Sequence, residues 1–154
     1  MISVQTKDFS LADEYQQLRN KLPERTGAIV TFSGLVRDYG DQNGVSSLEL
    51  EHYEGMTQRS LQAIVDDASQ RWDIIDTRII HRIGRLELSD QIVFVGVSSA
   101  HRLAAFQACE FIMDYLKTSA PFWKKEITND NATWVEAKQS DAAQADTWES
   151  KNTL

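Results

Sequence analysis

The sequence contains only one cysteine, two prolines and seven glycines among its 154 residues. Cys109 alone can form no internal disulfide and supplies no multi-cysteine framework for a metal ion. No stretch approaches the roughly 18 apolar residues of a membrane span, and the N-terminus lacks the basic and then apolar run of a secretory signal. We therefore expect a cytoplasmic protein.

Positive charge is also scarce. The chain has 16 Lys and Arg against 23 Asp and Glu, a net charge of −7, which opposes the phosphate attraction on which nucleic-acid binding depends. With 42% hydrophobic and 25% charged residues, the composition fits one compact domain over residues 1–154.

Sequence periodicity predicts a mixed set of helices and strands. Apolar residues at helical spacing and capping residues predict helices from Ser10 to Pro23, from Thr57 to Trp72 and from about His101 to Pro121. Runs of β-branched and aromatic residues predict strands at 27–37, 45–54, 77–83, 92–98, 122–127 and 133–137. The polar segment 138–154 is either a docked helix or a tail. This order indicates one α+β domain with helices on a largely antiparallel sheet.

Two cations stand at the expected start of the third helix. His101 and Arg102 there oppose the helix dipole, at a cost of a few tenths of a kcal/mol or about 1 kcal/mol at most. If an anion binds, the free N–H groups and the arginine fork form a phosphate site. Solvated first-turn residues are the alternative, and the sequence leaves both open.

A second group of cations follows the far end of this helix. Lys117 complements the helix dipole, and in KTSAPFWKKE apolar bulk separates it from Lys124. Apolar surroundings disfavour the charged form of lysine, and a neutral amine can act as nucleophile or base. Arg37, which leaves the 27–37 strand, is either a surface charge or a ligand.

The remaining candidates for chemistry are interpreted as structural. Phe106 and Ile112 flank Cys109 at helical spacing, so Cys109 is predicted to be a core thiol and not a sulfur carrier. His52 and His81 lie in predicted strands and show no metal-ligand spacing.

Six sequence blocks occur in the order FSGLVR (32–37), LEHYEGMT (50–57), IHRIGRL (80–86), VFVGVSSAHR (93–102), FIMDYLKTSAPFWKKE (111–126) and WVEA (134–137). Together they span most of the chain and resemble the MoaE family, the large, catalytic subunits of molybdopterin synthase. Leu35 differs from the lysine that members of the family can carry. Lys125 in place of an arginine keeps the charge but gives up bidentate geometry.

The resemblance implies an α/β hammerhead-type fold with a small β subdomain, and a homodimer within a heterotetramer. It implies a small ubiquitin-like partner of the MoaD type, ending in Gly-Gly, whose C-terminal thiocarboxylate supplies sulfur. The implied reaction inserts two dithiolene sulfurs into cyclic pyranopterin monophosphate (precursor Z) to give molybdopterin, without a resident cofactor or metal. The resemblance assigns catalysis to Lys117 and Lys124, and the substrate pocket to Val36, Arg37, His101, Arg102, Lys125 and Glu126.

Helix geometry adds an expectation about assembly. His101 and Lys117 stand 16 positions apart, which on one helix separates their backbones by roughly 24 Å. No Pro or Gly between Leu103 and Leu116 would break that helix. If both ends serve one small substrate, two protomers must share each site.

Two other functions were compared with sulfur transfer. An acyl or phosphoryl transferase would use the same cations, but no Gly-rich phosphate loop and no Ser-His-Asp arrangement is present. A non-catalytic docking module for a ubiquitin-like protein would use Phe122 and Trp123 as interface anchors. Product formation distinguishes these possibilities.

Overall fold

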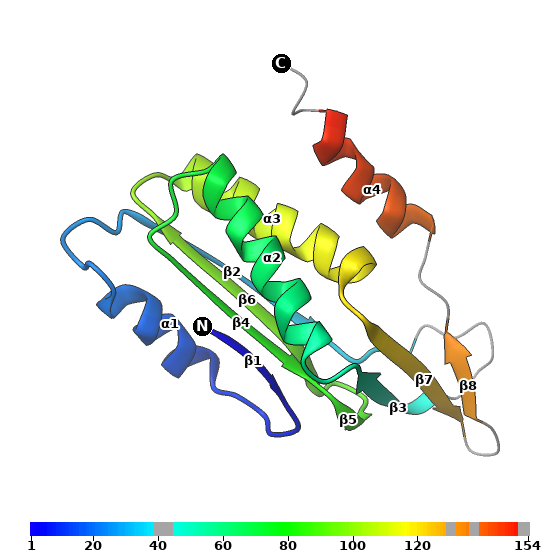
Figure 1. The fold of residues 1–154 in the computed structure, drawn as a ribbon. Coiled ribbons are helices and arrows are strands. Elements are labelled where there is room, and N and C mark those ends of the chain that lie inside the picture. Colours follow the sequence, from blue (N-terminus) through cyan, green and yellow to red (C-terminus); the bar gives the residue numbers. More distant parts are fainter. Residues whose placement is uncertain (39–44, 129–131, 136–138, 151–154) are drawn as a thin grey trace.

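The computed structural model describes residues 1–38, 45–128, 132–135 and 139–150 (Figure 1). Along the chain the elements are β1 (Ile2–Gln5), α1 (Leu11–Asn20), β2 (Ala28–Leu35), β3 (Val45–His52), α2 (Met56–Arg71), β4 (Asp76–Arg82), β5 (Gly84–Glu87), β6 (Gln91–Ser99), α3 (Arg102–Ser119), β7 (Phe122–Thr128), β8 (Ala132–Val135) and α4 (Gln139–Ser150).

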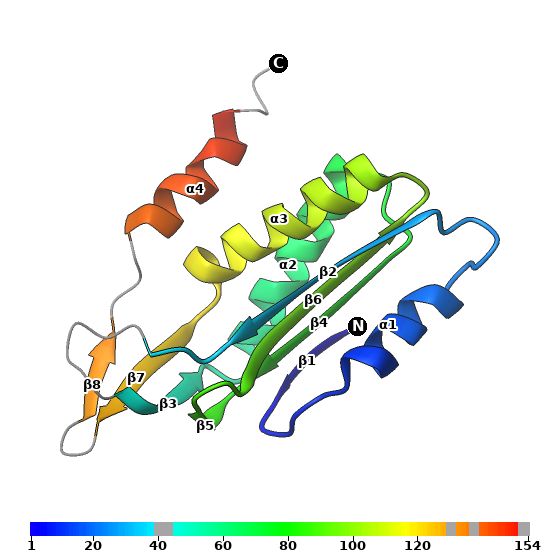
Figure 2. The ribbon, with the colours of Figure 1, turned by 180° about the vertical axis from the view of Figure 1, so that it is seen from behind.

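The larger layer is a four-stranded sheet, here sheet A, with the strand order β1-β4-β6-β2. The pairing of β1 with β4 is parallel, and the other two pairings are antiparallel. Helices α2 and α3 cover one face of sheet A, where the main core includes Ile79, Val95 and Phe111. Helix α1 packs on the opposite face through Leu18, against Phe94 (Figure 2).

A second four-stranded sheet, here sheet B, has the order β5-β3-β7-β8 and only antiparallel pairings. It lies beyond one end of sheet A (Figure 1). The chain passes directly from β4 in sheet A to β5 in sheet B at Gly84, whose φ of +82° is accessible to glycine at little cost. The predicted α+β fold with a small β subdomain is confirmed.

The longest helices follow the predicted apolar spacing. In α2 the buried stripe includes Leu61, Ile64 and Ala68, while α3 runs unbroken for 18 residues. The prediction that Thr57 caps α2 is wrong, because the N-cap is Gly55, two residues earlier, at φ +81°. Thr57 is instead buried in the first turn, and its hydroxyl donates to the Tyr53 carbonyl at 2.8 Å.

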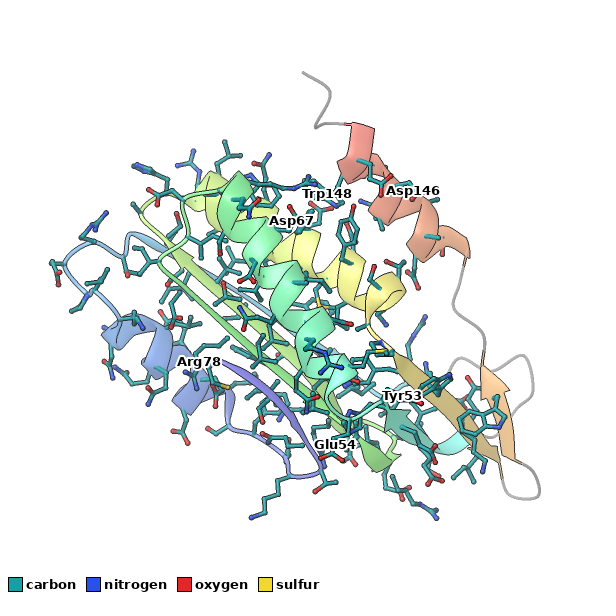
Figure 3. The ribbon with its side chains drawn as sticks, in the orientation of Figure 1. Tyr53, Glu54, Asp67, Arg78, Asp146 and Trp148 are labelled. Atoms are coloured by element: carbon teal, nitrogen blue, oxygen red, sulfur yellow. The ribbon has the colours of Figure 1, made fainter. Side chains whose placement is uncertain are left out.

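Residues 139–150 form a docked helix, one of the two alternatives predicted for 138–154, and the other residues of that segment lie outside the described ranges. Trp148 of α4 is 4% exposed and packs edge-on against Trp72 and Phe111 (Figure 3). Its indole nitrogen donates to Asp114 Oδ2 at 2.6 Å. One indole therefore fixes a polar helix onto α3.

Two strands, β1 and β5, were not predicted from the sequence. The turn expected between the strands at 77–83 and 92–98 contains β5, which pairs with β3 in sheet B. The N-terminal strand β1 pairs with β4. Among the helices of the described ranges, none is long and apolar enough to span a membrane.

Candidate functional site

The two ends of α3 carry the cations singled out in the sequence. Both His101 and Arg102 are exposed at its start, and Lys117 is exposed in its last turn. Because α3 is continuous, their backbones are separated by roughly 24 Å, at 1.5 Å per residue. One protomer therefore does not bring these groups together.

At its start, α3 is held by backbone contacts. The N-cap residue His101 offers no side-chain cap, and its own N–H donates to Ser99 Oγ at 3.4 Å. The Gly27 N–H donates to the Ser99 carbonyl at 3.0 Å, and a Cβ at Gly27 would lie 2.3 Å from the Ala100 carbonyl oxygen. Glycine is needed for this close approach, which fixes where α3 begins.

At the other end, α3 leads directly into β7. Pro121 follows the C-cap Ala120, and the Tyr53 N–H donates to the Pro121 carbonyl at 3.4 Å. Within β7, Phe122 and Lys124 share one face of sheet B and pair with His52 and Leu50 of β3. Lys117 and Lys124 therefore lie on either side of the junction between α3 and sheet B.

The other predicted pocket residues on β7 divide between two faces. Glu126 lies on the same face as Lys124, because alternate residues of a strand point to the same side. Lys125 points to the opposite face, where its ammonium lies 5.5 Å from the centroid of the Trp134 ring. Within one protomer, the side chains of Lys124 and Lys125 therefore lie on opposite faces of sheet B.

Val36 and Arg37 follow β2 at the same end of sheet A as sheet B. Val36 is 3% exposed and packs with Leu48, Leu50 and Leu86 of sheet B. Its N–H donates to the Asp90 carbonyl at 2.9 Å. Arg37, the next residue, is exposed, so the packing of Val36 places Arg37 at the end of the molecule that carries Lys124.

Two histidines, interpreted from sequence as structural, lie beside the lysine end of α3. His81 of β4 is buried, and its ring stacks on Phe122 at 3.7 Å between centroids with 15° between the planes. Burial lowers the pKa of His81 from 6.5 to about 4, and the nearby charge of Lys117 also lowers it. His81 is therefore neutral at physiological pH. It lies close enough to Lys117 for the lysine charge to affect its pKa.

The position of His81 could have been found in the sequence. Thr77, Ile79 and His81 alternate along β4, and all three are buried. The alternation places His81 on the face that α2 and α3 cover. Its contact with Phe122 depends on sheet B and had no sequence signal.

Cys109 is a core thiol, as predicted. It is 4% exposed, and burial raises the pKa of its thiol to about 12. The thiolate, which is the reactive form, is therefore negligible at neutral pH. Within the described ranges, no group of three or more His, Cys, Asp and Glu side chains is arranged to hold a metal ion.

An open pocket of about 310 Å³ lies between α1 and β2, and Tyr15 and Arg19 contribute to its lining. None of the predicted site residues lines this pocket. Gly27, which also contributes to the lining, adjoins Ser99 and Ala100, so the pocket lies near the start of α3 and away from its lysine end.

Comparison with known proteins gives a consistent result. A family model described as "MoaE protein" matches residues 4–119. The molybdopterin synthase catalytic subunit of Vibrio cholerae is 55% identical over 148 residues, covering 96% of this chain and 97% of that protein. The subunit of the same description from Escherichia coli K12 is 50% identical over 147 residues, covering 96% and 97%.

Among solved structures, the molybdopterin biosynthesis MoaE protein from Burkholderia ambifaria superposes with a TM-score of 0.83 at 48% identity, covering 97% of both chains. Fold, exposed cations and relatives together define the catalytic subunit of a biosynthetic enzyme. The chain belongs to the MoaE family, the catalytic subunits of molybdopterin synthase.

Proposed function

We propose that this chain transfers sulfur to cyclic pyranopterin monophosphate, and that the donor is the C-terminal thiocarboxylate of a small ubiquitin-like partner ending in Gly-Gly. The observation that carries this proposal is the placement of Lys117 and Lys124 at one junction, with Arg37 at the same end of the molecule. Both reactants are anions, and local cations favour their approach even on an acidic protein.

Each residue has a distinct part in this proposal. Lys117 and Lys124 act as the catalytic lysines. The substrate pocket is formed by Val36, Arg37, His101, Arg102, Lys125 and Glu126. No resident cofactor or metal takes part, and the reaction takes place in the cytoplasm.

The separation of the two α3 ends supports a shared site. A pterin phosphate is far shorter than roughly 24 Å of helix, so His101 and Arg102 serve the lysines of a second protomer. A two-fold homodimer within the heterotetramer supplies this arrangement twice, because an isologous interface repeats every contact. The opposite orientations of Lys124 and Lys125 on β7 are also compatible with groups from more than one chain surrounding the substrate.

The decisive experiment mixes the purified chain with a thiocarboxylated small partner and cyclic pyranopterin monophosphate, and measures dithiolene formation. A partner lacking its terminal Gly-Gly is the matched control, and it should bind more weakly and deliver no sulfur. A partner ending in two bulky residues should also fail, because only residues without side chains are expected to fit a narrow channel beside Phe122 and Trp123. Tight partner binding without any dithiolene would indicate a docking module instead.

A further inference from the structure

The relative position of Lys117 and Lys124 depends on how two parts of the fold are joined. Lys117 belongs to α3, which packs on sheet A, whereas Lys124 belongs to β7 of sheet B. Pro121 and the adjoining residues connect α3 to β7, but a short connection alone leaves the direction of β7 adjustable. Contacts between the two sheets must therefore fix the strand.

One contact between the two sheets close to these lysines is aromatic. His81 lies in β4 of sheet A, and Phe122 is the first residue of β7. Their rings are nearly parallel, at 15°, with centroids 3.7 Å apart. Phe122 lies two residues before Lys124 on the same face of the strand, so the orientation of Phe122 is coupled to the direction of the lysine.

A hydrogen bond to the backbone orients the ring of His81. Its Nδ1 lies 2.8 Å from the Arg82 carbonyl oxygen. A carbonyl oxygen only accepts, so Nδ1 carries the hydrogen and donates it. The ring is thereby held in one tautomer and one orientation on the side opposite α1, and it is neutral at physiological pH because burial lowers its pKa to about 4.

A second histidine lies beside Phe122 as its cross-strand partner in β3. The ring of His52 lies 6.4 Å from that of Phe122, and its Nδ1 lies 3.2 Å from Thr57 Oγ1. The Thr57 hydroxyl hydrogen is already donated to the Tyr53 carbonyl, so Nδ1 of His52 must be the donor to Thr57 Oγ1. Phe122 therefore contacts the ring of His81 closely and has the ring of His52 as its cross-strand neighbour.

We propose that His81 is a positioning residue for sulfur transfer, and that its stack on Phe122 holds β7 so that Lys124 keeps its position relative to Lys117. This inference rests on the proposed function for its kinetic consequence, whereas its geometric part stands by itself. In this role, His81 contacts neither reactant and acts only through Phe122. A positioning role predicts a loss of kcat, since displacements of about 1 Å can cost about 100-fold in rate.

The kinetic test compares three variants of the full chain, assayed with the small partner. In His81→Ala, kcat should fall about 10- to 100-fold while KM for the partner stays within about twofold. In His81→Phe, which retains an aromatic ring, kcat should return to within about threefold of the unchanged chain. A His81→Phe chain as slow as His81→Ala would overturn the stacking role.

The matched control is Ile80→Ala. Ile80 is the neighbouring residue of β4, is 2% exposed and packs towards α1 on the opposite face of sheet A. Its truncation should reduce stability at least as much as His81→Ala, but kcat of the folded protein should change by no more than about twofold. Equal losses of kcat in Ile80→Ala and His81→Ala would reduce His81 to a general core residue and overturn the proposal.

A geometric test needs no activity. A chain carrying Lys117→Cys and Lys124→Cys is treated with a short bismaleimide, and the cross-linked peptide is quantified by mass spectrometry. Cys109 does not compete, because it is buried and its thiol pKa is about 12. Adding His81→Ala should slow cross-linking at least about fivefold through a lower effective concentration of one thiol at the other, and His81→Phe should restore it.

The kinetic assay and the cross-linking assay together distinguish failure of the proposed function from failure of the positioning role of His81. If the unchanged chain forms no dithiolene, the proposed function fails, while the cross-linking rates still decide whether His81 positions β7. If dithiolene forms but His81→Ala leaves both kcat and the cross-linking rate unchanged, the positioning role fails and the proposed function stands.

Discussion

The two ends of α3 both present cations, but the surrounding chain treats them differently. At the start, Arg102 opposes the helix dipole, at a cost of about 0.3–1 kcal/mol. Among the described residues, neither its side chain nor that of His101 has a hydrogen-bond or ion-pair partner. At the other end, Lys117 complements the dipole, and the strand that follows is anchored on His81.

This difference indicates which cations of α3 have a structural explanation and which need a functional one. The lysine end would be favourable in any folded helix, so its charge alone says little about function. The start of α3 gains nothing from its own chain, so a visiting anion is the simplest compensation for its cations. The start of α3, which has fewer contacts, is therefore the end that says more about function. Each variant below changes one of the two ends of α3 or the region between them.

The largest effect is expected at the lysine end. Lys117→Ala and Lys124→Ala should each reduce turnover by about 100- to 10,000-fold, the range for a lost proton-transfer or nucleophilic group. The fold and the dimer should persist, because Lys117 is exposed and Lys124 is only partly buried. Turnover is measured with both reactants, and circular dichroism and gel filtration check the fold. Turnover within twofold of the unchanged chain would remove these lysines from the mechanism.

The next effect concerns stability near His81. Its pKa is about 4 in the folded chain and near 6.5 when unfolded, so the unfolded state binds the proton first as pH falls. The associated stability is fully present above pH 6.5 and is lost as pH falls towards about 4. The loss amounts to about 3 kcal/mol at most. Urea unfolding at pH 7 and pH 4.5 should show a smaller decline for His81→Phe than for the unchanged chain, and parallel declines would contradict it.

A smaller effect is expected at the start of α3. Arg102→Ala should lower kcat/KM by about 10- to 100-fold, because a hydrogen bond to a charged group contributes about 1.5–3 kcal/mol. Mixing this variant with Lys117→Ala should recover activity, because a mixed dimer regains one intact site of two by symmetry. If verified mixed dimers recover no activity, all these residues act within one protomer and the shared site is wrong.

The smallest effect on turnover is expected for Cys109→Ala, which changes the interior of α3 between its two ends. Turnover should remain unchanged, because sulfur arrives from the partner and the buried thiol is not ionised. Stability should fall by about 1 kcal/mol, a common cost of a core substitution. A fully stable variant that lost turnover would show that the thiol takes part in the reaction.

Local patterns in the sequence determined most of the elements. The helical spacing of α2 and α3 and the alternation in β3 and β4 arise within a few residues, and so the predicted elements match the structure. The cap of α2 was misplaced because Gly55 adopts a positive φ that no side-chain pattern records. Strands β1 and β5 were missed because four residues carry too little periodicity, and their partners are distant in sequence.

The sequence by itself determined that the cations at the two ends of α3 are far apart, because helix length follows directly from residue number. Only the tertiary structure decided what surrounds each end. The His81–Phe122 stack joins strands of different sheets. What Lys124 and Lys125 face on the two sides of β7 is decided only when β7 lies between β3 and β8 in sheet B. Such contacts depend on how sheet B is set against sheet A, and no local propensity specifies that arrangement.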